Sequence, residues 1–243
     1  MITIILGMHR SGTSTIAGVL HLNNISMGTY KNFWPRPLAQ NPKGFYENYD
    51  FRKLNDLLLK KVNYNVKSLN PVIPNSIHSE KLFKKMKTLI LQSNKYYNDW
   101  GWKDPRTCLT INIWNDVFNE LEIMNDLKII FVSRKAISVA RSLNKRDGLP
   151  INEGVELWKT YTERALNYSL KSNFNVFYCT FEQLLKEPIP TCEKIFSFLD
   201  RDFDSAVIDK FIDKSISTSG AGIDFEQSKE ITSLEKKIDS LIS

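Results

Sequence analysis

Apolar residues occur in two kinds of run along this chain: short continuous runs, and longer ones at helical spacing. The continuous runs predict buried strands at 2–6, 100–103, 127–133 and 175–180. Apolar positions three or four apart predict helices at 13–22, 49–62, 79–97, 107–120, 135–145, 151–172, 181–186, 191–199 and 204–212. Strands that alternate with helices indicate an α/β fold, a central parallel sheet with helices on both faces.

Several segments lack such periodicity. Residues 23–48 are rich in proline, and a loop of this length usually has a function. Its aromatic side chains are expected either to line an acceptor pocket or to pack the loop onto the core: Phe33, Trp34, Phe45 and Tyr46. Further loops are predicted at 63–78 and 215–222, and a marginal charged helix at 228–242. We therefore expect one domain over residues 1–243, with a core at 1–212 and a loop and tail helix at 213–243.

The first strand, loop and helix form a phosphate-binding pattern. Gly7 and Gly12 bound the loop, and the hydroxyl residues Thr13–Thr15 stand where helix starts favour them. Free backbone N–H groups and the helix dipole both point at such a loop, which indicates a P-loop-like, three-layer fold. The lysine that a P-loop carries after its second glycine is missing, and the cation, Arg10, lies inside the loop. The pattern indicates a phosphate or sulfate held by another cation arrangement; a tight turn without a ligand is the alternative.

Cations follow three of the predicted strands. Arg10, Lys103 and Arg134 each lie at or just past the carboxyl end of a strand. Because parallel strands end at one edge of the sheet, where ligands bind in such folds, we expect the three side chains to converge there.

The composition of the chain limits which ligands it is expected to bind and in which cellular compartment it is expected to act. The net charge of +6 suits an anionic ligand, whereas no basic run interleaved with aromatics indicates nucleic-acid binding. Three cysteines without C-x-x-C spacing fit a reduced, cytoplasmic protein. We expect no signal peptide, no transmembrane segment and, because the histidines are scattered, no metal site.

Two separated motifs resemble the sulfotransferases that use 3′-phosphoadenosine 5′-phosphosulfate (PAPS). The segment Leu6–Ser14 is similar to the family's 5′-phosphosulfate loop, a basic residue followed by Ser/Gly-Gly-Thr-Thr/Ser. The segment Val132–Ser142 is similar to its 3′-phosphate site, a strand followed by Arg and, eight residues later, Ser. Arg134 and Ser142 have that spacing, and they would give a phosphate a bidentate fork and a hydroxyl donor.

Two shorter segments support the resemblance, which runs from residue 1 to about 200. Trp102–Arg106 is similar to the Lys-Asp-Pro segment of bacterial and protein-tyrosine sulfotransferases, whose lysine lies beside the sulfuryl group. Phe181–Pro188 is similar to a Tyr-Glu-Asp/Asn-Leu segment near the adenine, with Phe181 in place of Tyr.

The resemblance implies a PAPS-dependent sulfotransferase of the bacterial, carbohydrate-type branch. It would transfer a sulfuryl group without metal to an acceptor hydroxyl, with a glycan expected first, and release 3′-phosphoadenosine 5′-phosphate (PAP). The implied nucleotide contacts are His9, Arg10, Ser11, Gly12, Thr13, Ser14, Arg134 and Ser142.

The implied catalytic residues are few. Arg10 and Lys103 would stabilise charge on the sulfuryl group, and Glu47 is the candidate base, with Asp104 as the alternative. Cys108 follows the Lys-Asp-Pro segment, and we expect it only to pack. A kinase with a degenerate P-loop and a nucleotide-binding protein without catalysis are the rival functions.

Overall fold

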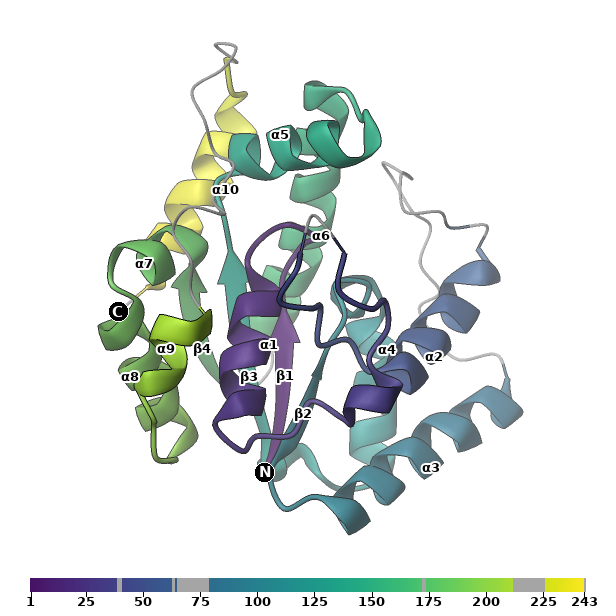
Figure 1. The fold of residues 1–243 in the computed structure, drawn as a ribbon. Helices are drawn as coiled ribbons and strands as arrows, with labels where there is room; N and C mark the ends of the chain where they lie inside the picture. The colour runs from purple at the N-terminus through teal and green to yellow at the C-terminus, as the bar shows by residue number, and fades with distance from the viewer. Residues whose placement is uncertain (39–40, 63, 65–78, 172–173, 212–225, 243) are drawn as a thin grey trace.

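Four strands form a parallel sheet in the computed structural model, which describes residues 1–38, 41–62, 64, 79–171, 174–211 and 226–242. Their order is β2-β1-β3-β4, with bounds β1 Ile2–Leu6, β2 Trp100–Lys103, β3 Leu127–Ser133 and β4 Asn175–Thr180 (Figure 1). Ile5 pairs with Lys103, and Leu6 pairs with Phe131. Because the strands are parallel and in this register, the segments that follow them emerge at one edge of the sheet, as the sequence predicts.

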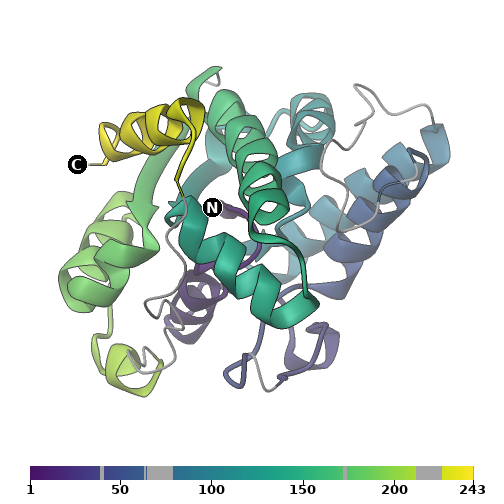
Figure 2. The ribbon, with the colours of Figure 1, turned by 90° about the horizontal axis from the view of Figure 1, so that it is seen from above.

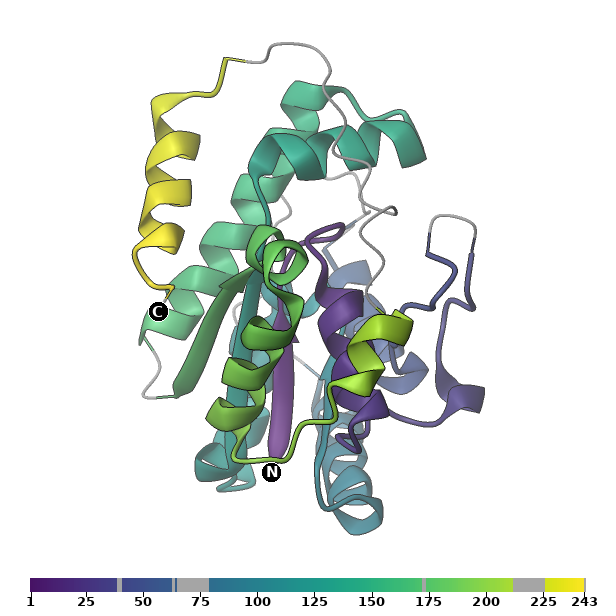
Figure 3. The same ribbon diagram turned by 60° about the vertical axis from the view of Figure 1, so that its left-hand side comes forward.

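Helices cover both faces of the sheet, which confirms the α/β fold (Figures 1 and 3). Neighbouring strand residues point to opposite faces, so Ile4 and Ile129 join one apolar core while Ile5 and Ile130 join the other. The first core is completed by α2 Tyr49–Lys60, α3 Glu80–Tyr96, α4 Thr107–Glu120, α5 Ala136–Asp147, α6 Ile151–Lys171 and α10 Lys229–Asp239. The second is completed by α1 Thr13–Leu22, α7 Phe181–Lys186, α8 Pro188–Leu199 and α9 Ala206–Phe211.

One helix boundary differs clearly from its prediction. The pattern places the start of α8 at residue 191, with Pro188 as a stop, but α8 begins at Pro188 itself. The first turn of a helix needs no backbone N–H, so proline fits its first position. Pro188 therefore ends one helix and begins the next.

The less regular segments divide into described and undescribed parts. The segment 23–48 contains one 3₁₀ turn, Tyr30–Asn32, and a bridge between Phe33 and Asn48. The predicted loops at 63–78, apart from residue 64, and at 215–222 lie outside the described residues. The tail helix is α10, which buries Ile231, Leu234 and Ile238. Over the part of the chain that the structure describes, every helix is too short or too polar to cross a membrane.

Candidate active site

A cavity of about 590 Å³ opens at the carboxyl edge of the sheet, the edge seen from above in Figure 2. Its volume falls within the range of roughly 300–1,000 Å³ that is typical of small-molecule sites. Its wall comes from the loop after β1, the start of α1, residues within 35–38 and 41–47, the ends of β2, β3 and α5, and α7. Eight of the ten residues proposed for the site from sequence line it: His9, Arg10, Gly12, Thr13, Ser14, Glu47, Lys103 and Arg134.

The loop after β1 turns through two left-handed residues. Arg10 has a φ of 70° and Gly12 a φ of 86°. Gly12 is the N-cap of α1, no side chain caps this helix, and the hydroxyl residues Thr13–Thr15 occupy its first turn. A Cβ on Gly12 would lie 2.2 Å from the Phe181 ring, so both the backbone and the packing require glycine. The start of α1 is therefore left without a side-chain cap beside the cavity.

Arg10 and Arg134 meet at this loop. The Arg134 guanidinium donates from Nη1 to the Arg10 carbonyl oxygen at 3.1 Å and lies over the Phe181 ring, 5.0 Å from its centroid. Arg10 Nε donates to Ser142 Oγ at 2.8 Å. Burial and neighbouring cations lower the pKa of Arg10 to about 10, and burial also lowers the pKa of Arg134. Both guanidinium groups are thus poorly compensated in charge and suited to an anion.

Glu47 and Lys103 form a buried ion pair on another part of the wall. Lys103 Nζ lies 2.8 Å from Glu47 Oε1 and donates to Ser14 Oγ at 3.1 Å. Lys103 ends β2, Ser14 lies in the first turn of α1 and Glu47 lies in the irregular segment, so three separate elements meet at one ammonium group. The predicted base, the predicted lysine and the anion loop are therefore in direct contact.

Arg106 holds the Glu47 carboxylate from the other side. Its Nη2 lies 3.5 Å from Glu47 Oε2, its Nη1 lies 2.8 Å from Asp56 Oδ1, and its Nε lies 2.9 Å from Asp104 Oδ1. Burial alone would lower the pKa of Arg106, but three carboxylates outweigh it and raise the pKa. Arg106 is thus a structural cation that orients its neighbours.

Asp104, the alternative base, is placed differently from Glu47. It is 1% exposed and does not line the cavity. It accepts hydrogen bonds from the backbone N and Nε of Arg106 and from Asn55. Asp104 is thus held within the fold by these hydrogen bonds, whereas Glu47 lines the cavity.

Two predicted contacts, Ser11 and Ser142, do not line the cavity. Ser11 is fully buried, and its Oγ has no hydrogen-bond partner among the described residues. Ser142 reaches the site only through Arg10. Cys108, expected to pack, is buried and accepts a hydrogen bond from the Gly7 backbone at 3.2 Å, and burial raises the pKa of its thiol to about 12.

His9 lies on the cavity wall in an unusual environment. Its Nε2 is enclosed and has no partner within the described part of the chain, and its ring packs edge-on against Tyr161. Burial, reinforced by Arg106 and other nearby cations, lowers its pKa well below the ordinary value. The imidazole is therefore neutral near pH 7.

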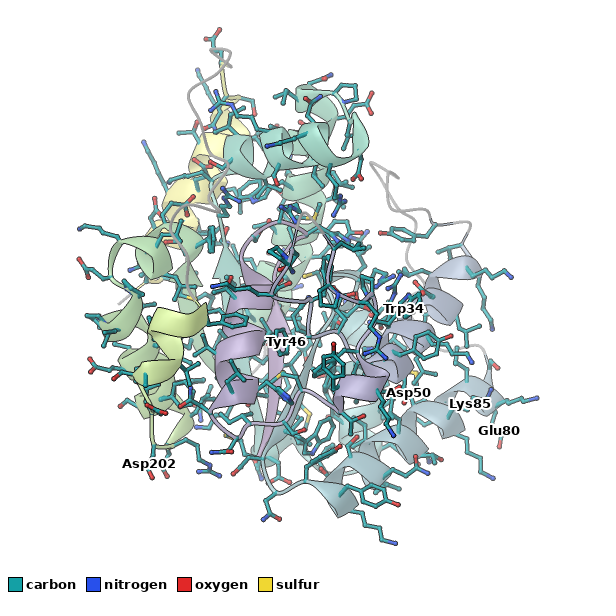
Figure 4. All side chains as sticks on the ribbon, in the orientation of Figure 1. Trp34, Tyr46, Asp50, Glu80, Lys85 and Asp202 are labelled. Atoms are coloured by element: carbon teal, nitrogen blue, oxygen red, sulfur yellow. The ribbon has the colours of Figure 1, made fainter. Side chains whose placement is uncertain are left out.

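The aromatic residues of the irregular segment take both expected roles. Phe33 and Tyr46 pack with His21 of α1, whereas Phe45 lines the cavity. Trp34 is 50% exposed. Figure 4 shows Trp34 and Tyr46 on the face of the molecule that carries α1.

Some cavity residues were not singled out from the sequence. Arg106 belongs to the Lys-Asp-Pro-Arg segment, but nothing in that pattern shows its partners. Arg146 was detectable in principle, because it lies four residues after Ser142 and so on the same face of α5. Phe211, at the end of α9, has no sequence signal. Among the residues that the structure places, no three His, Cys, Asp or Glu side chains gather as a metal site requires.

Comparison with known proteins identifies the fold. No family model matches the sequence, and no curated protein matches it. The structure is similar to the sulfotransferase domain of the Synechococcus PCC 7002 olefin synthase, with a TM-score of 0.58 and 16% identity over 98% of this chain and 94% of that one. It is also similar to the sulfotransferase domain of the curacin biosynthetic pathway, with a TM-score of 0.59 and 16% identity over 98% and 97% of the two chains. The chain therefore has the α/β fold of these sulfotransferase domains.

Proposed function

We propose that the protein is a PAPS-dependent sulfotransferase. The observation that carries this proposal is the contact of Lys103 with both Glu47 and Ser14. A carboxylate that can take a proton, a cation that can stabilise developing charge and the start of an anion-binding helix are joined at one point of a cavity. The sulfotransferase fold of the chain supports the same assignment.

The residues that line the cavity suit a nucleotide with phosphate groups at both ends. The loop from His9 to Ser14 and the uncapped start of α1 would hold the 5′-phosphosulfate, and Arg134 would hold the 3′-phosphate. Phe181 and Leu185 of α7 supply apolar surface on the same wall, as a purine requires. PAPS, when bound, supplies an activated sulfuryl group.

Each side chain has its own role in the proposed transfer. Glu47 accepts the proton of the acceptor hydroxyl as its oxygen bonds to sulfur, and the bond from sulfur to the bridging phosphate oxygen breaks, leaving its electron pair on PAP. Lys103 and Arg10 stabilise the charge on the sulfuryl and bridging oxygens. Arg106 keeps the Glu47 carboxylate in place through the reaction.

The acceptor that we propose is a glycan hydroxyl, as the carbohydrate-type branch implies. The cavity wall that includes Glu47 also includes Pro35, Leu38 and Phe45, and Trp34 directly precedes Pro35 in the chain. Exposed aromatic and apolar surface of this kind packs well against the C–H faces of sugar rings. The free, buried cysteines are in keeping with the reducing cytoplasm that we propose as its location.

Ligand-dependent stability tests the nucleotide assignment against the kinase rival. PAP without Mg²⁺ should raise the melting temperature, since a ligand at about 100 times its Kd stabilises the folded state by about 2.7 kcal/mol. ATP with Mg²⁺ should have little effect, because the loop lacks the P-loop lysine. The opposite ranking would favour the kinase.

Replacement of the base tests catalysis against mere binding. Glu47→Gln should lower turnover with PAPS and a glycan acceptor by about 10²-fold or more, while the Kd of PAP changes little. Glu120→Gln, at an exposed ion pair with Lys87, is the matched control and should retain full turnover. Unchanged turnover in Glu47→Gln would place the base elsewhere.

A further inference from the structure

The turn between β3 and α5 is held by carboxylates from two distant elements. Lys135, the N-cap of α5, provides no side-chain cap of its own. Its backbone N–H donates to Glu182 Oε1 of α7 at 3.1 Å. The next N–H, that of Ala136, donates to Glu235 Oε1 of α10 at 2.8 Å, across a sequence separation of 99 residues. The start of α5 is therefore capped from outside.

The contact with α10 is more than a single hydrogen bond. Lys135 Nζ lies 3.7 Å from Glu235 Oε2 and 3.2 Å from Asp239 Oδ2. The Glu235 side chain is only 12% exposed, so its charge is poorly screened by solvent. Its position at the start of α5 also places a negative charge at the positive end of the helix dipole.

The apolar face of α10 fixes this carboxylate in place. Ile231, Leu234 and Ile238 are buried in the same core as α5 and α6. Figure 3 shows α10 lying alongside this part of the molecule. Glu235 lies between these anchors in the sequence, and its side chain is directed at the first turn of α5.

Arg134 directly precedes the capped turn. The next two backbone N–H groups, those of Lys135 and Ala136, donate to Glu182 and Glu235, so these carboxylates hold the backbone that carries the Arg134 side chain. The Arg134 side chain itself touches the Arg10 carbonyl and the Phe181 ring, not α10. Any effect of Glu235 on a ligand must therefore pass through the placement of Arg134 and α5.

We propose that Glu235 is a positioning residue that caps α5 and so aims Arg134 at the 3′-phosphate of the nucleotide. This inference rests on the proposed function, because it takes Arg134 as the 3′-phosphate contact. It gives the C-terminal helix a role in nucleotide affinity although no residue of α10 lines the cavity.

The affinities for two nucleotides distinguish a positioning role of Glu235 from a general effect on the stability of the protein. PAP carries the 3′-phosphate, and adenosine 5′-monophosphate lacks it. Glu235→Ala should raise the Kd of PAP about tenfold, equivalent to about 1.4 kcal/mol, and leave the Kd of adenosine 5′-monophosphate within about twofold. Glu235→Gln keeps an acceptor oxygen for the Ala136 N–H and should recover part of the PAP affinity. Isothermal titration calorimetry measures both.

The control lies on the same helix. Glu230 is 72% exposed and pairs with Lys159, so Glu230→Ala should bind both nucleotides as the unaltered protein does. In the Arg134→Ala background, Glu235→Ala should cause no further loss of PAP affinity, because the two residues act through one contact.

The outcomes distinguish this inference from the proposed function. Three results would overturn the positioning role alone. In Glu235→Ala, these are an equal loss of affinity for both nucleotides or an unchanged affinity for PAP. In the double variant, it is a full additional loss of PAP affinity. Failure of the unaltered protein to bind PAP would overturn the proposed function and this inference with it. If Glu235→Ala does not fold, the Glu235→Gln variant decides by the same ratio of the two Kd values.

Discussion

The arginines of the cavity form two groups with opposite electrostatics. Arg106 makes ion pairs with the carboxylates of Glu47, Asp56 and Asp104, and they raise its pKa. Arg10 and Arg134 donate to a serine hydroxyl and a backbone carbonyl, and their pKa values are lowered. Among the described residues, neither of these two lies within ion-pair distance of a carboxylate.

We propose that this difference separates Arg106, which stabilises the site, from Arg10 and Arg134, which would bind the ligand. A buried arginine whose charge is already balanced gains little from an incoming anion. Arg10 and Arg134 lie next to each other, and the acidic side chains that act on them, Asp147 and Glu182, do not outweigh the effect of burial on their pKa values, so a bound phosphate would stabilise both cations. Charge balance thus indicates the role of each side chain where proximity to the cavity does not.

The largest expected effect is the loss of Arg106. Arg106→Ala leaves three carboxylates without their shared cation, two of them buried, and should lower the free energy of unfolding by about 3–5 kcal/mol. Urea denaturation without nucleotide measures it. Arg201→Ala removes an exposed pair with Asp99 and should cost about 1 kcal/mol or less. Equal losses in the two variants would contradict the structural role of Arg106.

Arg134 should show the reverse behaviour. Arg134→Ala removes charge-assisted hydrogen bonds to the nucleotide and should raise the Kd of PAP by roughly 30- to 150-fold, equivalent to about 2–3 kcal/mol. The free energy of unfolding should change by about 1 kcal/mol or less, since only one hydrogen bond and a ring contact are lost. If Arg134→Ala binds PAP with unchanged affinity, Arg134 does not bind the nucleotide.

The smallest expected effect is the pH dependence caused by His9. Burial among cations lowers its pKa in the folded state, so below about pH 6.5 the unfolded chain binds a proton that the folded chain does not. Stability should therefore fall as the pH falls, by at most about 1.4 kcal/mol per pH unit from this group. Urea denaturation between about pH 7.5 and about pH 5 measures the slope, which should be shallower in His9→Gln. Identical slopes would contradict the assigned environment.

Most of the fold could be predicted because its strands and helices are local patterns. The runs at 2–6 and 127–133 are mostly apolar, as is typical of strands covered on both faces, and both are strands of the sheet. The start of α8 was misjudged because a proline at the first position of a helix and one that ends a helix look alike in sequence. That residues 1–243 form a single domain stays a prediction.

The candidate site was predictable only in part. Arg10 and Arg134 follow strands of the sheet, so topology alone brings them together. Ser11 and Ser142 stand in the right motifs, but the orientation of a side chain depends on packing that the motif does not specify. The partners of Arg106 come from α2 and the irregular segment, and no local pattern records such long-range ion pairs. The site roles themselves stay proposals.

The three thiols have a practical consequence. Cys108, Cys179 and Cys192 are free and buried, and burial raises the pKa of each to about 12. A thiol reagent can modify these buried cysteines only when the surrounding structure opens locally or globally, so the labelling rate measures how often such opening occurs. Because Cys108 accepts a hydrogen bond from Gly7, its labelling reports on the anion loop itself, without any engineered probe.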